Sequence, residues 1–175
     1  MDLLRQVGIE PAQVDPAELD ETPAPAETPR AYALRIALAK LAVVMPRHPG
    51  KLVLAADSVV ALGRRILPKA ESEAEARQCL ALLSGRRHRV LGGVAVGTAN
   101  SRVRTRLVES VVRFKRLEAA EIEGYLDSGE WQGKAGGYGI QGRAAAFVSF
   151  LSGSYSNVVG LPLFETVQLL RADQA

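Results

Sequence analysis

One carboxylate in this sequence lies where a strand would normally carry only apolar side chains. Asp57 is at the centre of the run LVLAADSVVAL, between Ala55–Ala56 and Val59–Val60. A carboxylate in such surroundings is costly unless it is hydrogen-bonded, paired with a cation or bound to a metal. The run therefore predicts either a functional carboxylate or a strand-end Asp that caps a neighbouring turn, and the residues alone leave both interpretations open.

A second candidate site is the segment 133–142, GKAGGYGIQG, which contains five glycines. Backbone amides without side-chain bulk can approach an anionic group or a nucleobase, and Lys134 adds a positive charge. The spacing matches neither a P-loop nor a dinucleotide-binding fingerprint. A long connection between a helix and a strand therefore remains the alternative interpretation.

Lysine is scarce, since the chain has 22 basic residues and only five of them are lysines: Lys40, Lys51, Lys69, Lys115 and Lys134. Lys69 follows Pro68, just beyond a predicted hairpin that begins with the Asp57 strand. An ammonium group near a carboxylate suits a polyphosphate held together with a divalent ion. The alternative for each lysine is a solvated surface charge, and Lys40 could snorkel from an apolar helix.

Cysteine and histidine are too few for a disulfide framework or a zinc cage. Cys79 is the only cysteine, and His48 and His88 are the only histidines. Each histidine stands beside arginine, and we expect both at the surface. Cys79 falls on the apolar face of a predicted helix, so we expect it in the core, and a lone thiol fits a reducing, cytoplasmic location.

The elements that must position these residues are helices and strands in mixed order. Helices are predicted over 2–7, 29–45, 72–85, around 122–126 and from 162 onward, with Thr28 as an N-cap and Ser72 with Glu75 as a capping box. Strands are predicted over 52–62, 89–96, 102–114 and 144–150, with turns at 63–64 and 97–101. This order predicts an α/β or α+β fold.

Composition indicates one globular domain over residues 1–175. Hydrophobic residues make up 47% of the 175 residues and charged residues 23%, which is enough for a real core. The net charge is +3 without a basic run, and aromatic residues are only 5%, so a nucleic-acid partner is not expected. No apolar stretch approaches the roughly 18 to 20 residues of a membrane span, and the first residues lack the pattern of a signal peptide.

Several motifs, taken together, resemble the Maf family of nucleoside triphosphate pyrophosphatases. They are AADSVV at 55–60, ILPKAES at 66–72, GKAGGYGIQG at 133–142 and GSYSNVVGLPL at 153–163, in the family's order. The resemblance implies an inosine-triphosphatase-like fold of two lobes, with an elongated mixed sheet and flanking helices around a central cleft. It also implies cleavage of a nucleotide between its α and β phosphates, which yields a monophosphate and pyrophosphate.

The resemblance implies a role for each matching residue. Asp57 matches the Asp of the family's A-D-[ST]-V motif, the proton acceptor for the attacking water. Glu21 matches an acid at the end of the family's second strand, and with Asp57 it would hold a divalent metal, Mg²⁺ or Mn²⁺. Lys69 matches a substrate-binding lysine, although Ala70 stands where the family has proline.

Three further residues are implied to bind substrate. Lys40 matches the lysine of the helix that follows the acid, although Ala39 replaces the usual Glu. Ser58 and Gln141 fall at positions associated with substrate choice, and Ser58 keeps the hydroxyl of the commoner threonine. The form YGIQG resembles the branch of the family that hydrolyses dTTP and UTP.

The sequence departs from the family pattern at its start. Family members open with a strand and a loop, S-x-S-P-R-R, whose hydroxyl and guanidinium groups would bind the triphosphate. We expect this strand and loop to be missing here. The resemblance thus implies either a dTTP/UTP pyrophosphatase or a truncated, non-catalytic nucleotide-binding or division-linked partner of the same fold, and in both cases a possible homodimer.

Overall fold

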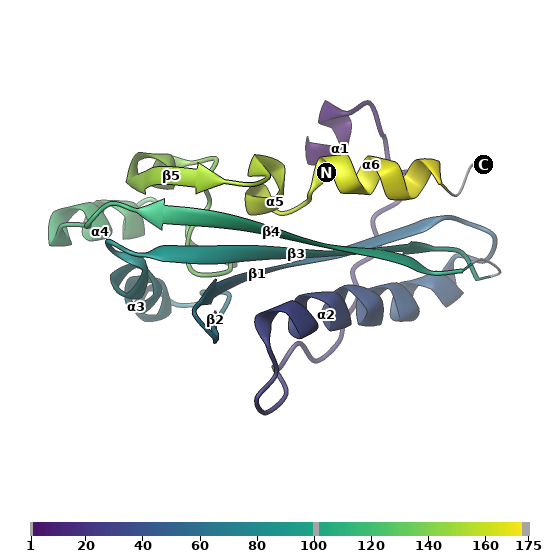
Figure 1. The fold of residues 1–175 in the computed structure, drawn as a ribbon, viewed down its shortest axis with the longest axis horizontal. Helices are drawn as coiled ribbons and strands as arrows, with labels where there is room; N and C mark the ends of the chain where they lie inside the picture. The colour runs from purple at the N-terminus through teal and green to yellow at the C-terminus, as the bar shows by residue number, and fades with distance from the viewer. Residues whose placement is uncertain (1, 100–101, 173–175) are drawn as a thin grey trace.

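The computed structural model describes residues 2–99 and 102–172, and its centre is one long, twisted five-stranded sheet (Figure 1). The strands are Val53–Leu62 (β1), Arg65–Leu67 (β2), Arg87–Gly97 (β3), Arg104–Phe114 (β4) and Val148–Ser152 (β5). They lie in the order β2-β1-β3-β4-β5. The predicted α/β class, with helices flanking an elongated sheet, is confirmed.

The strand pairing differs from the mixed sheet that the family resemblance implied. Every pairing among the described strands is antiparallel. The reason is local, because β1–β2 and β3–β4 are consecutive strands joined by short connections that reverse the chain. The helical connections from β2 to β3 and from β4 to β5 also return the chain so that β3 and β5 run against their neighbours.

Helices cover both faces of the sheet (Figure 1). On one face lies α2 (Pro29–Val44), followed by a short 3-10 turn, η1 (Met45–Arg47). On the other face lie α1 (Asp2–Gln6), α5 (Tyr155–Val159) and α6 (Leu163–Arg171), whereas α3 (Glu73–Leu83) and α4 (Ala119–Leu126) pack together at one end. None of the helices in residues 2–99 and 102–172 is both long enough and apolar enough to cross a membrane.

The side chains of β1 alternate between two covered faces, which explains its continuous apolar run. One row packs against α2, and the other packs against the opposite layer; the first contains Val53, Ala55, Val59 and Ala61, and the second Leu54, Ala56 and Val60. Asp57 belongs by this alternation to the row that faces α2. Ser58 belongs to the opposite row.

The close approach of α2 to the sheet depends on a glycine in β3. A Cβ atom at Gly93 would lie 2.2 Å from the carbonyl oxygen of Ala33, so no larger residue fits without moving the helix. The predicted N-cap is confirmed, because the Thr28 hydroxyl accepts a hydrogen bond from the Ala31 amide and Pro29 opens the first turn. Consequently α2 lies tightly against β1 and β3.

Most predicted boundaries hold within two residues, and the last strand is the main exception. Residues 143–147 form a 3-10 turn, η2 (Arg143–Phe147), and β5 begins only at Val148 instead of at residue 144. The apolar side chains of Ala144 and Phe147 are buried by this turn rather than by a strand. Residues 100 and 101 of the predicted turn at 97–101 lie outside the described residues.

The prediction that both histidines lie at the surface is wrong for His88, which is only 2% exposed. Its Nε2 atom lies 2.7 Å from the hydroxyl oxygen of Tyr138, and its ring packs edge-on against Phe114. The alternation of β3 explains the error, because Arg87 and Arg89 point to the opposite face. The prediction that Cys79 lies in the core is confirmed.

Candidate functional site

Asp57 and Lys40 each interrupt an apolar surface, and they face each other. The Nζ atom of Lys40 lies 2.7 Å from the Oδ1 atom of Asp57. The Asp57 side chain is 3% exposed and that of Lys40 is 18% exposed, so both charges are largely removed from water. Because Asp57 lies in the middle of β1, the alternative of a strand-end cap does not apply.

Two more charged residues complete a four-membered cluster with alternating charge. Lys40 also lies 2.8 Å from Glu21, and the other carboxylate oxygen of Glu21 accepts a hydrogen bond from Lys69. Lys69 in turn lies 4.0 Å from Asp57 Oδ1. Four separate segments therefore converge here: the loop before α2, α2 itself, β1 and the segment after β2.

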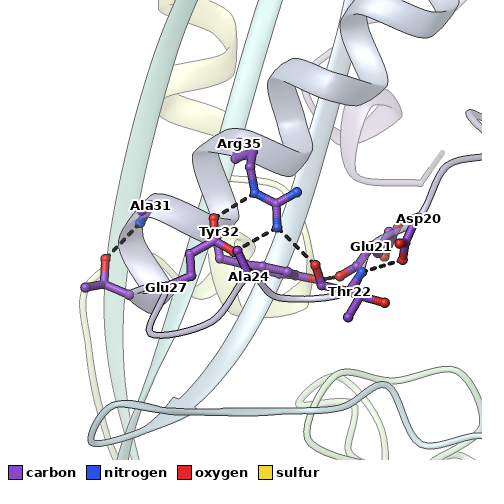
Figure 2. A network of polar contacts seen from close by, with 9 residues as sticks. Asp20, Glu21, Thr22, Ala24, Glu27, Ala31, Tyr32 and Arg35 are labelled. Atoms are coloured by element: carbon purple, nitrogen blue, oxygen red, sulfur yellow. Dashed lines mark hydrogen bonds and ion pairs between the residues drawn. The ribbon is translucent and has the colours of Figure 1, made fainter.

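A network of hydrogen bonds fixes the loop that carries Glu21 to the first turns of α2 (Figure 2). The guanidinium group of Arg35 donates two hydrogen bonds of 2.7 Å to the carboxylate of Glu27 and one of 3.2 Å to the carbonyl of Thr22. The hydroxyl of Tyr32 donates to the carbonyl of Glu21 at 2.7 Å. Glu21 is thus held by its backbone while its side chain reaches the two lysines.

The pKa shifts in this cluster have different directions. Burial raises the pKa of Asp57, although the hydrogen bond from Lys40 opposes it. Burial alone would raise the pKa of Glu21, but the hydrogen bonds from Lys40 and Lys69 outweigh it and lower that pKa. Burial likewise opposes the charge of Lys40, yet its two carboxylate partners raise its pKa. Asp57 therefore accepts a proton more readily than an exposed aspartate, whereas the two lysines favour the ionised form of Glu21.

Asp57 and Ser58 line two adjoining pockets. The first has a volume of about 440 Å³ and also contains Glu21 in its wall, and the second has a volume of about 240 Å³ and contains Gln141. Lys69 lines both, so the pockets meet beside the charged cluster. The hydroxyl of Ser58 donates a hydrogen bond of 3.1 Å to the carbonyl of Gly160, which joins β1 to the end of α5.

The glycine-rich segment 133–142 is tied by its backbone to the segment that carries Lys69. Gly133 donates to the Ala70 carbonyl at 2.8 Å, Ala70 donates to the Lys134 carbonyl at 3.1 Å, and Gly136 donates to the Pro68 carbonyl at 2.9 Å. Gly136 has a φ of +67°, and a Cβ there would meet Val60 at 2.8 Å. The segment is thus a fixed wall of the second pocket and not only a connection.

The structure brings together the six residues that the sequence analysis selected. Five of them, Glu21, Lys40, Asp57, Ser58 and Lys69, lie at or beside the meeting point of the pockets, and Gln141 lies in the wall of the second pocket. Sequence reasoning missed Tyr125 and Tyr138, whose hydroxyl groups hold the glycine-rich segment. The sequence offered one signal for them: each is a tyrosine, with a polar hydroxyl, among residues that are otherwise apolar or glycine.

The carboxylates of this cluster fit a divalent cation that is shared with a phosphorylated ligand. In the described residues, Oδ2 of Asp57 is buried and has no hydrogen-bond partner, so it is free to accept one more ligand. The described residues contain no group of three His, Cys, Asp or Glu side chains that could enclose a metal. Mg²⁺ characteristically uses one or two carboxylates together with phosphate oxygens and water. Asp57 and Glu21 match that requirement.

Comparison with known proteins identifies close relatives. The chain is 62% identical over 170 residues to a dTTP/UTP pyrophosphatase of Caulobacter vibrioides, which covers 97% of this chain and 88% of the relative. It is 63% identical over 170 residues to the dTTP/UTP pyrophosphatase of Rhodospirillum rubrum, covering 97% and 81% of the two chains. The family model described as Maf-like protein matches residues 1–173. The chain therefore belongs to the Maf family.

Proposed function

We propose that this chain is a nucleoside triphosphate pyrophosphatase that hydrolyses dTTP and UTP to the monophosphate and pyrophosphate. The observation that carries the proposal is the buried Asp57, which is paired with Lys40 and lies where two pockets meet. The names of the relatives, which match nearly the whole chain, support the same activity and substrates.

The two pockets suggest how the substrate would lie. The second pocket offers an amide, Gln141, and fixed backbone groups, which suit the polar edge of a pyrimidine base. The first pocket has Lys69 and the carboxylates of Glu21 and Asp57 in its wall, which suits β and γ phosphates that are bound together with a divalent metal. The α phosphate would then lie at the junction, beside Asp57 and Lys69.

In the reaction, a water oxygen forms a bond to the α phosphorus, and the bond from that phosphorus to the oxygen bridging the α and β phosphates breaks. Asp57 accepts the proton of the water, and pyrophosphate carries away the electron pair of the broken bond. The raised pKa of Asp57 makes it a better base than an exposed carboxylate. Lys40 and Lys69 balance the charge that accumulates on the departing pyrophosphate.

Asp57 and Glu21 would hold a divalent metal, Mg²⁺ or Mn²⁺, together with phosphate oxygens. Such an ion supplies positive charge that neutralises the phosphates and lowers the pKa of bound water. The chain's own contribution is to place both carboxylates beside Lys40, whose charge favours their ionised forms against burial, and to fix with Arg35 the loop that carries Glu21.

The direct test is pyrophosphate release from UTP and dTTP by the 175-residue chain, with Mg²⁺ and with excess chelator. We expect release with Mg²⁺ and none with the chelator. Tight binding of UTP by a folded chain that releases no pyrophosphate would contradict the proposal and favour the non-catalytic alternative.

Replacing Lys69 with glutamine is expected to lower kcat/KM for UTP by about 10-fold. The side chain is 43% exposed, so its charge is partly screened by water, and the loss of stability on its removal should be small. Steady-state kinetics measures the effect, and the exposed Lys51→Gln variant is the matched control. Equal activity in both variants would remove Lys69 from the phosphate-binding residues.

We further propose that the chain acts in the cytoplasm as a homodimer built from a single two-lobed domain over residues 1–175. The lone, buried Cys79 suits a reducing compartment, and the family resemblance supports the dimer. Light scattering should give twice the chain mass of 18.7 kDa. A mass of one chain at micromolar concentration would contradict the dimer.

A further inference from the structure

The Gln141 amide in the second pocket lies near Gly139, on the side where a Cβ atom would be in van der Waals contact with it. A Cβ atom at Gly139 would be 3.4 Å from Oε1 of Gln141 and 3.6 Å from its Nε2. Within the described part of the chain, no hydrogen bond to protein holds this amide. Because the side chain is exposed, what the fold determines is the backbone from which it projects, and Gly139 is two residues before it.

Gly139 is held by a buried hydroxyl from another element. The amide of Gly139 donates a hydrogen bond of 3.1 Å to the hydroxyl oxygen of Tyr125, which is on α4 and is almost completely buried. The Tyr125 ring packs against Phe147 at a centroid distance of 5.5 Å, which fixes the direction of the hydroxyl. A buried side chain that is fixed by packing is a rigid support for the loop backbone.

The preceding loop residue has an anchor of its own. The hydroxyl of Tyr138 lies 2.7 Å from Nε2 of His88 on β3, and its ring packs against Phe114 at 4.8 Å. Two consecutive residues, Tyr138 and Gly139, are thus fixed from two different elements, β3 and α4, two to three residues before the exposed Gln141. The loop backbone is rigid at the point where it supports the amide.

The orientation of a carboxamide decides which pyrimidine it matches. Uracil and thymine present an N–H donor and a carbonyl acceptor on the edge where cytosine presents a ring-nitrogen acceptor and an amino donor. An amide has one acceptor and one donor end, so it matches uracil in one orientation and cytosine when it flips or shifts. Discrimination between the two bases therefore requires that the amide stay in place.

We propose that Tyr125 is a positioning residue for base selection, because its hydroxyl holds Gly139 and thereby the loop backbone from which Gln141 projects into the second pocket. The inference rests on the proposed function, since it assumes that the second pocket binds the pyrimidine. Tyr125 itself does not touch the substrate. Its removal should change the choice between UTP and CTP rather than the hydrolysis of the phosphate bond.

The experiment compares Tyr125→Phe, which removes only the hydroxyl, with Tyr155→Phe, the same change at a residue that is 51% exposed and lines neither pocket. The readout is the ratio of kcat/KM for UTP to that for CTP, at a temperature well below unfolding. We expect Tyr125→Phe to lower this ratio about fivefold, mainly through KM for UTP, which is the effect of one hydrogen bond. Tyr155→Phe should leave the ratio unchanged.

A double mutant separates positioning from a purely structural role. In a Gln141→Ala background, Tyr125→Phe should change the ratio less than about twofold, because the group that it positions is gone. An unchanged ratio in Tyr125→Phe, or an equal fall in the Gln141→Ala background, would overturn the inference. If Tyr125→Phe fails to fold, Tyr138→Phe provides the second variant, since it removes the hydroxyl contact with His88 that holds the neighbouring residue of the same loop.

The positioning role of Tyr125 and the proposed pyrophosphatase activity can fail independently of each other. Absence of pyrophosphate release by the wild-type chain would contradict the pyrophosphatase activity but not the positioning role. Equilibrium dialysis of UMP and CMP against the same variants then measures base selection without turnover. A UMP preference that Tyr125→Phe leaves intact would overturn the positioning role whatever the activity.

Discussion

Replacement of Asp57 with asparagine is expected to lower pyrophosphate release from UTP by roughly 10²- to 10⁴-fold, the usual contribution of a general base. Asparagine keeps the shape of the side chain but cannot accept the proton of the attacking water. It also removes one of the two carboxylates that face the phosphates. The assay is the release of pyrophosphate with Mg²⁺ under saturating UTP.

The same substitution should leave the fold nearly intact. Burial raises the pKa of Asp57, so its charge is not itself a large source of stability, and Lys40 keeps Glu21 as a partner at 2.8 Å. Because the Lys40 charge stays compensated by Glu21, we expect the free energy of unfolding in urea to change by clearly less than the roughly 3 to 5 kcal/mol of a broken buried pair. The exposed Asp127→Asn variant is the matched control and should keep full activity. If the Asp57→Asn variant retained turnover, Asp57 could not be the general base.

The stability of the protein should fall steeply as the pH is lowered from 7 to 5, because of His88. Burial lowers the pKa of His88 to about 4 from its usual value of 6.5, against a smaller opposing contribution from the Arg86 backbone. Between these two values the unfolded chain binds a proton that the folded chain does not, so acid favours unfolding. The stabilisation is fully present above about pH 6.5 and is lost progressively down to about pH 4.

The size of this effect follows from the pKa difference. It amounts to about 3 kcal/mol in total and about 2 kcal/mol by pH 5. Urea unfolding at pH 7 and pH 5 measures it, and the His88→Gln variant should lose most of the difference because it keeps a polar partner for Tyr138 without titrating. His48 remains in both proteins as an internal control. An equal pH dependence in the two proteins would contradict the assignment to His88.

The parts of the site that the sequence could predict are those that break a regular pattern. Asp57 interrupts a strand that is apolar at nearly every other position, and its partner Lys40 interrupts the buried face of α2. Their meeting follows from the packing of α2 on β1. Glu21, by contrast, lies in a loop without periodicity, so only the family resemblance could select it.

The predictions from the sequence were wrong or incomplete where the position of a residue depends on tertiary packing. The arginines beside His88 suggested an exposed position, yet the alternation of β3 turns the histidine into the aromatic cluster and the arginines away from it. The strand predicted from residue 144 begins at Val148, because Ala144 and Phe147 are buried by a 3-10 turn. The hydroxyl of Tyr125 reaches a loop 14 residues away, which no local pattern reveals.

The adjacency of Asp57 and Ser58 on β1 limits how this strand can change during evolution. The two side chains belong to opposite faces, one toward Lys40 and the other toward the Gly160 carbonyl. Insertion or deletion of one residue between Val53 and Asp57 would exchange the faces, so that a hydroxyl would meet the lysine and a carboxylate would meet a carbonyl. The strand can therefore exchange one apolar residue for another, but its length before this pair can change only in steps of two.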